Sequence, residues 1–303
     1  MKLPYHDFAA FLAEHFPGKM QKIAVDAGFT CPNRDGTIST GGCSYCCNAS
    51  FSPAYCHEIP DIKAQLEEGK RFFGKKYSGM RYLAYFQSYT STHGRKVDQL
   101  MELYNTALEV DGVDGLIIGT RPDCVDVDLL KRIASLPWAM MEYGAESSHD
   151  ETLAAVNRGH TWEDVVRSVN LTAEAGMPVG IHLIMGLPGE TRDMMLRTID
   201  RVNDLPVDVV KIHQLQLLRG TRLTREVETG EKSIIRFTPD SYISLCAEII
   251  NHLRQDIAIE RFVSQAPADM LVYPRWGLKN YQFTNLLINY LNGKENDMGS
   301  QPS

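Results

Sequence analysis

Short apolar runs alternate along the chain with segments whose apolar positions repeat at helical spacing. The runs are rich in Val, Ile, Leu and aromatic residues, which indicates strands buried on both faces. The predicted strands are 22–27, 81–87, 113–119, 138–146, 179–186 and 207–218. The amphipathic segments that predict helices include 97–109, 162–175 and 191–202. About six strand–helix units in succession predict an α/β fold whose parallel sheet forms a partial or complete barrel.

The alternation becomes less regular in the last third of the chain. The elements expected there are a helix around 240–253, a short strand at 257–263 and a final helix near 281–291. We therefore divide the chain into a barrel core at 1–220, a C-terminal α+β extension at 221–292 that covers the barrel, and a last segment at 293–303. This last segment has too few apolar residues to pack and is expected to be a disordered tail.

The composition is that of an ordinary globular protein, with 303 residues, 44% of them hydrophobic and 23% charged. No stretch approaches the length of a membrane span, so we expect a cytoplasmic protein without a membrane partner. Seven cysteines, several of them close together, are more typical of metal ligands in a reducing compartment than of a disulfide framework.

The net charge of −7 argues against a broad cationic surface for nucleic acid. One local exception is the segment 69–82, which interleaves Lys and Arg with Phe and Tyr. It is a candidate docking site either for tRNA or for an acidic electron donor such as flavodoxin or ferredoxin.

Three cysteines in one glycine-rich loop after the first strand, Cys31, Cys43 and Cys46, are the strongest chemical signal. They would leave one metal position open. Two alternatives follow from the residues: a zinc ion completed by a fourth ligand, or an iron–sulfur cluster with one iron that the protein does not bind. The candidates for a fourth zinc ligand are Cys47, Cys56 and His57. Zinc sites usually have two ligand pairs, so the spacing and the barrel context favour the iron–sulfur cluster.

Seven motifs in chain order resemble the radical S-adenosylmethionine (SAM) superfamily, in particular the YhcC-like group related to the catalytic subunit of Elongator. The resemblance extends from about Phe16 to Trp276. The motifs are CPNRDGTISTGGCSYC, YFQSYTST, GTRPDC, MEYGAESS, NRGHT, HLIMGLPGET and KIHQLQLLRGT.

This resemblance implies a partial (β/α)6 TIM-like barrel and a [4Fe–4S] cluster held by Cys31, Cys43 and Cys46. It also implies that SAM chelates the open iron and is cleaved by one electron to a 5′-deoxyadenosyl radical, which removes hydrogen from a substrate.

The resemblance also predicts which residues bind the amino, carboxylate, ribose and adenine groups of SAM. The end of the second strand offers acceptors for the SAM amino group at Gln87, Ser88 and Thr90. Arg158 would bind its carboxylate. On the fourth and fifth strands, Glu142, Glu146 and His182 would offer polar groups to the ribose. Ile184 and the turn at Gly186 would contact the adenine.

Two further groups of residues are expected at the mouth of the barrel. Cys124, after the third strand, is a candidate catalytic thiol. Many relatives carry Gly-Asp-Gly-Pro where this chain has Ser264 to Pro267, which indicates a different substrate. The candidate substrate residues there are Arg261, Gln265, Arg275 and Trp276.

Three functions are compatible with the sequence. The preferred one is a radical SAM enzyme, of lyase or oxidoreductase type, that acts on a small molecule or a modified nucleobase and receives electrons from a flavodoxin or ferredoxin. A tRNA-modifying radical SAM enzyme is the second, and a non-catalytic, zinc-stabilised binding protein is the third.

Overall fold

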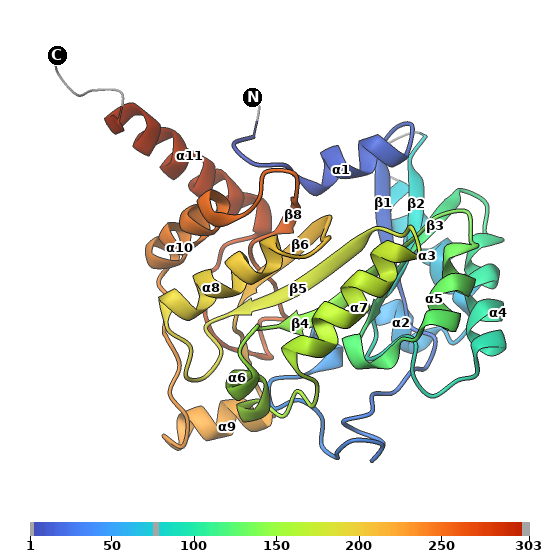
Figure 1. The fold of residues 1–303 in the computed structure, drawn as a ribbon, viewed down its shortest axis with the longest axis horizontal. Coiled ribbons are helices and arrows are strands. Elements are labelled where there is room, and N and C mark those ends of the chain that lie inside the picture. Colours follow the sequence, from blue (N-terminus) through green and yellow to red (C-terminus); the bar gives the residue numbers. More distant parts are fainter. Residues whose placement is uncertain (1–2, 75–78, 299–303) are drawn as a thin grey trace.

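A curled sheet of seven parallel strands forms the centre of the molecule (Figure 1). The computed structural model describes residues 3–74 and 79–298. The strand order is β1-β2-β3-β4-β5-β6-β8, and each neighbouring pair is parallel. The strands are β1 Met20–Val25, β2 Arg81–Phe86, β3 Val113–Thr120, β4 Ala139–Glu146, β5 Val179–Met185, β6 Val209–Gln214 and β8 Ala258–Arg261.

Amphipathic helices cover the outer face of the sheet, which is why the strands are apolar almost throughout (Figure 1). Their buried residues pack with those of the strands into one large core. The helices that contribute to this core are α3 Ile62–Gly74, α4 Val97–Leu108, α5 Val127–Ala134, α7 Trp162–Glu174, α8 Arg192–Asn203, α10 Pro239–His252 and α11 Asn280–Met298. The remaining helical elements are α2 Ala54–Glu58, α6 Asp150–Ala155, α9 Arg222–Glu228 and the short 3-10 turns η1 Asn48–Ser50 and η2 Pro122–Cys124.

Helix α1, Phe8–His15, closes the half barrel at the N-terminal ends of the strands. Its residues Phe11 and Leu12 pack in a second apolar cluster with residues near the beginnings of several strands, including Leu83, Met140 and Val209. Asp7 caps the helix by accepting a hydrogen bond of 2.8 Å from the Ala10 amide. The closed end leaves only the C-terminal ends of the strands open for a binding site.

The predicted α/β partial barrel is confirmed, with one addition from the extension. Strand β8 comes from the predicted extension and pairs with β6 as a seventh barrel strand. The single run predicted at 207–218 is two strands, because β7 (Leu217–Leu218) leaves the main sheet and pairs antiparallel with β9 (Leu271–Tyr273).

The last helix is longer than expected. Helix α11 continues to Met298 and so includes residues 293–298 of the predicted disordered tail; residues 299–303 lie outside the described part of the chain. Residues 75–78 of the predicted basic segment 69–82 lie outside it as well. Within the described ranges, no helix is both long enough and apolar enough to span a membrane.

Candidate active site

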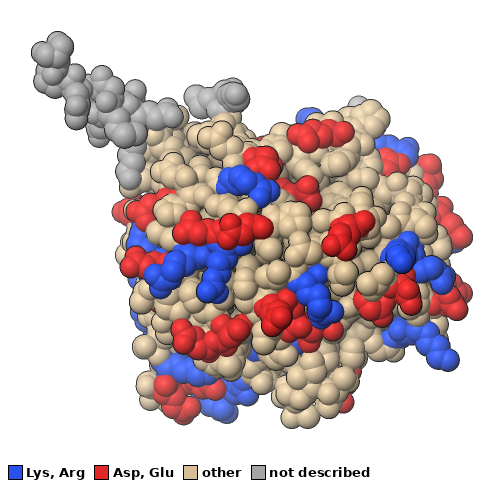
Figure 2. Space-filling view, in the orientation of Figure 1, with Lys and Arg blue, Asp and Glu red and all other residues tan. Residues whose placement is uncertain are grey.

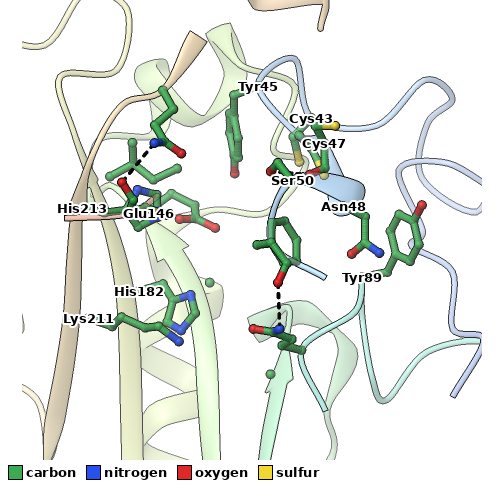
Figure 3. Close-up of a pocket in the computed structure, with 18 of the residues that line it drawn as sticks. Cys43, Tyr45, Cys47, Asn48, Ser50, Tyr89, Glu146, His182, Lys211 and His213 are labelled. Carbon is green, nitrogen blue, oxygen red and sulfur yellow. Dashed lines mark hydrogen bonds between the residues drawn. The ribbon is translucent and has the colours of Figure 1, made fainter. Parts of the chain in front are cut away.

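A pocket of about 380 Å³ opens at the C-terminal ends of the strands. The cysteine loop forms one side of it, and the ends of β4, β5, β6 and β8 form the other (Figure 3). In Figure 3 the loop residues Cys43 and Cys47 face His182, Lys211 and His213 across this space. The volume lies within the range of pockets that bind small organic ligands.

The three cysteines of the predicted cluster all line this pocket. Cys31 and Cys43 are buried, and Cys46 is half-buried. Two backbone hydrogen bonds form tight turns in the loop. The Arg34 amide donates to the Cys31 carbonyl at 2.7 Å, and the Cys46 amide donates to the Cys43 carbonyl at 3.1 Å. The structure therefore brings together three residues that the spacing linked.

Three side chains donate hydrogen bonds to the cysteine sulfurs. Thr90 Oγ1 lies 3.3 Å from Cys31 Sγ, and both Asn33 Nδ2 and Arg158 Nη1 lie 3.6 Å from Cys43 Sγ. Donors around a sulfur favour its thiolate form, which is the form that binds iron. The donor set therefore fits a thiolate-bound cluster.

The side chains proposed to complete a zinc site do not join the three cysteines. Cys56 lies in α2, where its thiol donates to the Ala24 carbonyl at 3.5 Å, and His57 is exposed. Only Cys47 of the three also lines the pocket. In residues 3–74 and 79–298, no three His, Cys, Asp or Glu side chains are grouped closely enough to hold one metal ion.

Arg158 is buried between the cysteine loop and the end of β4. Its Nη2 donates to the Gly144 carbonyl at 2.6 Å and lies 3.4 Å from Glu146 Oε1. A Cβ at position 144 would come within 2.4 Å of that guanidinium, so glycine makes this arrangement possible. Arg158 Nε is buried without a partner. Arg158 therefore lies where it could contact the SAM carboxylate as predicted, although Nη1 and Nη2 already have partners and only Nε does not.

The residues predicted at the end of β2 have different environments. Gln87 and Thr90 line the pocket, and Gln87 Nε2 donates to the Phe51 carbonyl at 3.1 Å. Ser88 is buried and does not line it. Tyr89, between them, has a φ of +57° and also lines the pocket.

Glu142 and His182 lie in a buried charged layer that forms the floor of the pocket. Lys211 Nζ lies 3.0 Å from Glu142 Oε1 and 2.7 Å from the Tyr85 hydroxyl oxygen, and His182 Nε2 lies 2.5 Å from Glu142 Oε1. Burial works against ionisation of Glu142, yet His182 and Lys211 hold its pKa well below the usual value. Burial lowers the pKa of Lys211 to about 8, against the opposing effect of Glu142.

Sequence reasoning missed most of this layer. Lys22, Tyr85, Lys211 and Glu260 received no role, although a charged residue within an apolar strand is a usable signal because it needs a partner when buried. Tyr45 was also missed; its hydroxyl is buried without a partner, and it lines the pocket.

The other predicted residues divide between the pocket and the surrounding structure. Ile184 lines the pocket, but Gly186 does not, and a Cβ there would come within 2.9 Å of Phe237. Cys124 lies outside the lining, and burial raises the pKa of its thiol to about 12.

Of the four candidate substrate residues, two line the pocket and two lie outside its lining. Arg261 and Gln265 line the pocket. Arg275 is exposed and donates to the Leu271 carbonyl at 3.1 Å. Trp276 donates to the Phe237 carbonyl at 3.1 Å and stacks on Phe283, so it anchors the extension.

Sequence comparison identifies the family. The family model described as the Radical SAM superfamily matches residues 34–202, more than half of the chain. The chain belongs to the radical SAM superfamily. A second model, the Radical_SAM C-terminal domain, matches residues 207–292 of this radical SAM protein. The superfamily uses a [4Fe–4S] cluster and SAM, so the predicted family and cofactors are confirmed.

Curated proteins are similar to this radical SAM chain over different shares of their length. Protein YtqA of Bacillus subtilis (strain 168) is 34% identical over 92% of this chain and 86% of its own. Protein YhcC of Escherichia coli (strain K12) is 34% identical over 94% and 91%. A tRNA uridine(34) acetyltransferase of Methanocaldococcus jannaschii is 27% identical over 58% of this chain, which spans only 32% of that enzyme.

Solved structures show the same fold. Elp3 from the archaeon Methanocaldococcus infernus, with an N-terminal deletion, superimposes with a TM-score of 0.67 over 92% of this chain and 64% of its own, at 19% identity. The hydrogenase maturase HydG of Carboxydothermus hydrogenoformans gives a TM-score of 0.56 at 14% identity, over 86% of this chain and 57% of its own.

Proposed function

We propose that this radical SAM protein is an enzyme that cleaves SAM reductively and uses the resulting radical to abstract hydrogen from a small-molecule or modified-nucleobase substrate, as a lyase or an oxidoreductase. The observation that carries the proposal is the position of Cys31, Cys43 and Cys46 on one side of a pocket at the C-terminal ends of parallel strands. Enzymes with this architecture place their chemistry at that end.

The chain's own residues would prepare the site for the cluster in two ways. The three cysteines would hold the cluster, and the donors Asn33, Thr90 and Arg158 would delocalise the charge on the thiolates, which makes reduction easier. When bound, the cluster and SAM supply an electron and a carbon radical that the protein cannot make alone.

The pocket walls would then orient SAM and exclude water. Ile184 packs in an apolar cluster with Tyr45, and this cluster would form a dry surface for the adenosyl group. Glu146 and Gln87 line the same space with oxygen and nitrogen atoms that could fix its polar groups.

The test is anaerobic incubation of the reconstituted protein with dithionite and SAM, followed by quantification of 5′-deoxyadenosine and methionine. The proposal predicts both products in equal amounts. A zinc-stabilised binding protein would be colourless and would leave SAM intact.

A tRNA substrate is the second candidate, and the similarity to enzymes named tRNA uridine(34) acetyltransferase favours it. Against it stands the net charge of −7. Figure 2 shows acidic and basic side chains interspersed on one face, without a broad cationic area there.

Charge reversal at Lys75 and Lys76, in the basic segment 69–82, separates the two roles proposed for that segment. Loss of tRNA retention by the Lys75→Glu/Lys76→Glu variant would favour the tRNA enzyme. Loss of the reduction rate with flavodoxin alone would favour docking of an acidic electron donor.

A further inference from the structure

The charged floor of the pocket contains one cation more than its anions balance. Lys22 Nζ lies 2.5 Å from Glu260 Oε2, and Lys211 Nζ lies 3.0 Å from Glu142 Oε1 and 3.4 Å from Glu260 Oε1. The two lysines and the two glutamates therefore neutralise one another, while burial lowers the pKa of His182 and favours its neutral ring. Arg261, next to Glu260 on β8, is the remaining charge.

The Arg261 side chain makes no hydrogen bond or ion pair with any residue in the described part of the chain, whereas its backbone pairs with β6 at Lys211. Its Nε is buried without a partner, and the side chain lines the pocket. Nε is the buried part of this half-buried side chain, and a buried N–H without a partner costs free energy unless a ligand or water completes it, because buried polar groups are almost always bonded.

His213, on the neighbouring strand β6, adds a hydrogen-bond acceptor. Burial and the nearby Arg261 lower its pKa to about 3, so the ring is neutral at physiological pH. Its Nδ1 lies 3.1 Å from the Gln214 carbonyl oxygen and must therefore carry the ring proton. Nε2 is left as an acceptor in the pocket wall.

Two glutamine side chains hold the adjoining loop in place. Gln214 Nε2 and Gln216 Nε2 both donate to the Ser264 carbonyl, at 3.1 and 3.0 Å. The Ser264 amide donates back to Gln214 Oε1 at 3.1 Å. The wall beside Arg261 is thus fixed before any ligand binds, as recognition of a small polar group requires.

The geometry points to a substrate-recognition site at Arg261 and His213 for a small molecule that carries a carboxylate or phosphate with an O–H or N–H group beside it. Arg261 binds the oxyanion with its planar fork, and His213 Nε2 accepts from the neighbouring donor. This site lies across the pocket from the cysteine loop. The inference deepens the proposed function and rests on it for the claim that the ligand is the substrate.

The dimensions of the pocket favour a small ligand over a macromolecule. About 380 Å³ must hold SAM and the reacting part of the substrate together. Arg261 lies beside Lys211 in the register of β6 and β8, and both residues line the pocket, so a ligand must enter the pocket to reach the guanidinium.

The test is a calorimetric titration of the cluster-loaded, SAM-saturated protein with inorganic phosphate and, separately, with succinate. We expect at least one of the two anions to bind with a dissociation constant in the millimolar range or below. Arg261→Gln should weaken it at least tenfold, and Arg261→Lys, which keeps the charge but loses the fork, should weaken it about threefold. Arg132→Gln, which removes an exposed arginine on the outer helix α5, should change nothing.

Four results would overturn the inference. The first is that neither anion binds to the wild type, and the second is that Arg261→Gln binds the anion as well as the wild type does. The third is that anion binding disappears when SAM is present. The fourth is that a tRNA transcript binds in an Arg261-dependent way while neither small anion binds. If Arg261→Gln does not fold, Arg261→Lys decides the outcome. Wild-type protein that binds an anion through Arg261 but forms no 5′-deoxyadenosine would refute the proposed function and leave this site standing; the reverse result would refute only the site.

Discussion

Three non-glycine residues of the described chain have positive φ angles, and all three lie around the cysteine loop. They are Tyr89 (+57°), Glu146 (+68°) and Asn157 (+55°). Asn157 Nδ2 donates to the Gly42 carbonyl at 2.9 Å, which ties the loop to the residue before Arg158. Such conformations cost roughly 1–3 kcal/mol each and persist where function requires a fixed geometry.

Replacement of Cys43 and of Cys47 by alanine should have opposite outcomes. Cys43 accepts hydrogen bonds from Asn33 and Arg158, whereas no such donors surround Cys47 among the bonds of the described chain. We expect Cys43→Ala to lose the iron and the brown colour after reconstitution, and Cys47→Ala to keep about four irons per chain. Iron and sulfide analysis checks this, and retention of a full cluster by Cys43→Ala would contradict the ligand assignment.

Arg158→Met should destabilise the cluster-free protein by about 3–5 kcal/mol, because it leaves the Glu146 carboxylate buried and unpaired. Denaturant unfolding measures the loss. The double variant Glu146→Gln/Arg158→Met should lose less than the sum of the two single variants, since the two side chains interact directly. Additive losses would show that the pair contributes nothing.

Site residues that are close together in the sequence could be predicted better than residues that the fold brings together from distant parts of the chain. Cys31, Cys43 and Cys46 lie in one loop, so their spacing alone placed them together. The pairing of Lys22 with Glu260 joins the first and last strands of the barrel, and only the curl of the sheet brings them together. The expectation that the extension covers the barrel also predicted Arg275 and Trp276 in the pocket, but they follow β9, which pairs with β7 outside the main sheet.

At the scale of elements, close packing of helices on strands fixes the half barrel. Helix α3 packs on β1 at Gly69, where an added Cβ would come within 2.3 Å of Ile23 Cγ2. Gly180 on β5 concerns the neighbouring strand instead, because a Cβ there would come within 3.3 Å of Glu142 Cγ on β4. The absence of a side chain at Gly180 therefore leaves room for Glu142 of the charged floor.

Gly69→Ala should therefore destabilise the protein by about 1–2 kcal/mol, since overpacking outweighs the gain in helix propensity. Gly293→Ala is the matched control, because no atom lies within 4 Å of a Cβ at that position in α11. It should be neutral or stabilising by up to about 1 kcal/mol. Thermal unfolding compares the two, and equal effects would contradict tight packing of α3 on β1.

The positions of the strands could be predicted because the strands are buried on both faces. The way in which the extension joins the barrel could not be predicted. The run 207–218 has no break in its apolar pattern, yet its chain leaves the sheet after Gln214. The bonds from Gln214 and Gln216 to Ser264 hold that turn, and they depend on a loop fifty residues later in the sequence.

The whole molecule is layered, with an apolar plug at α1, a charged floor, the pocket and the cysteine loop in order from one end of the half barrel to the other. Buried ionisable groups occur at several levels of this arrangement. Their protonation contributes to the stability of the whole fold.

Glu190 gives a specific pH dependence. Burial raises its pKa to about 7, although Ser147 Oγ donates to the carboxylate. Between pH 4.5 and 7 the folded chain holds a proton here that the unfolded chain has lost, so this group makes the protein less stable as pH rises through that window. The stability of Glu190→Gln relative to the wild type should therefore increase by about 2–3 kcal/mol from pH 5 to pH 8. A difference that does not change with pH would contradict the raised pKa.

The proposed function follows from the cysteine loop on one side of the pocket, which would make this chain a SAM-cleaving enzyme. The most direct measurement is 5′-deoxyadenosine formed in a single anaerobic incubation of dithionite and SAM with wild-type, Cys43→Ala and Cys47→Ala proteins, each after cluster reconstitution. We expect product from the wild type and from Cys47→Ala, and none from Cys43→Ala. A wild-type protein that holds a full cluster and binds SAM but leaves it intact would contradict the account.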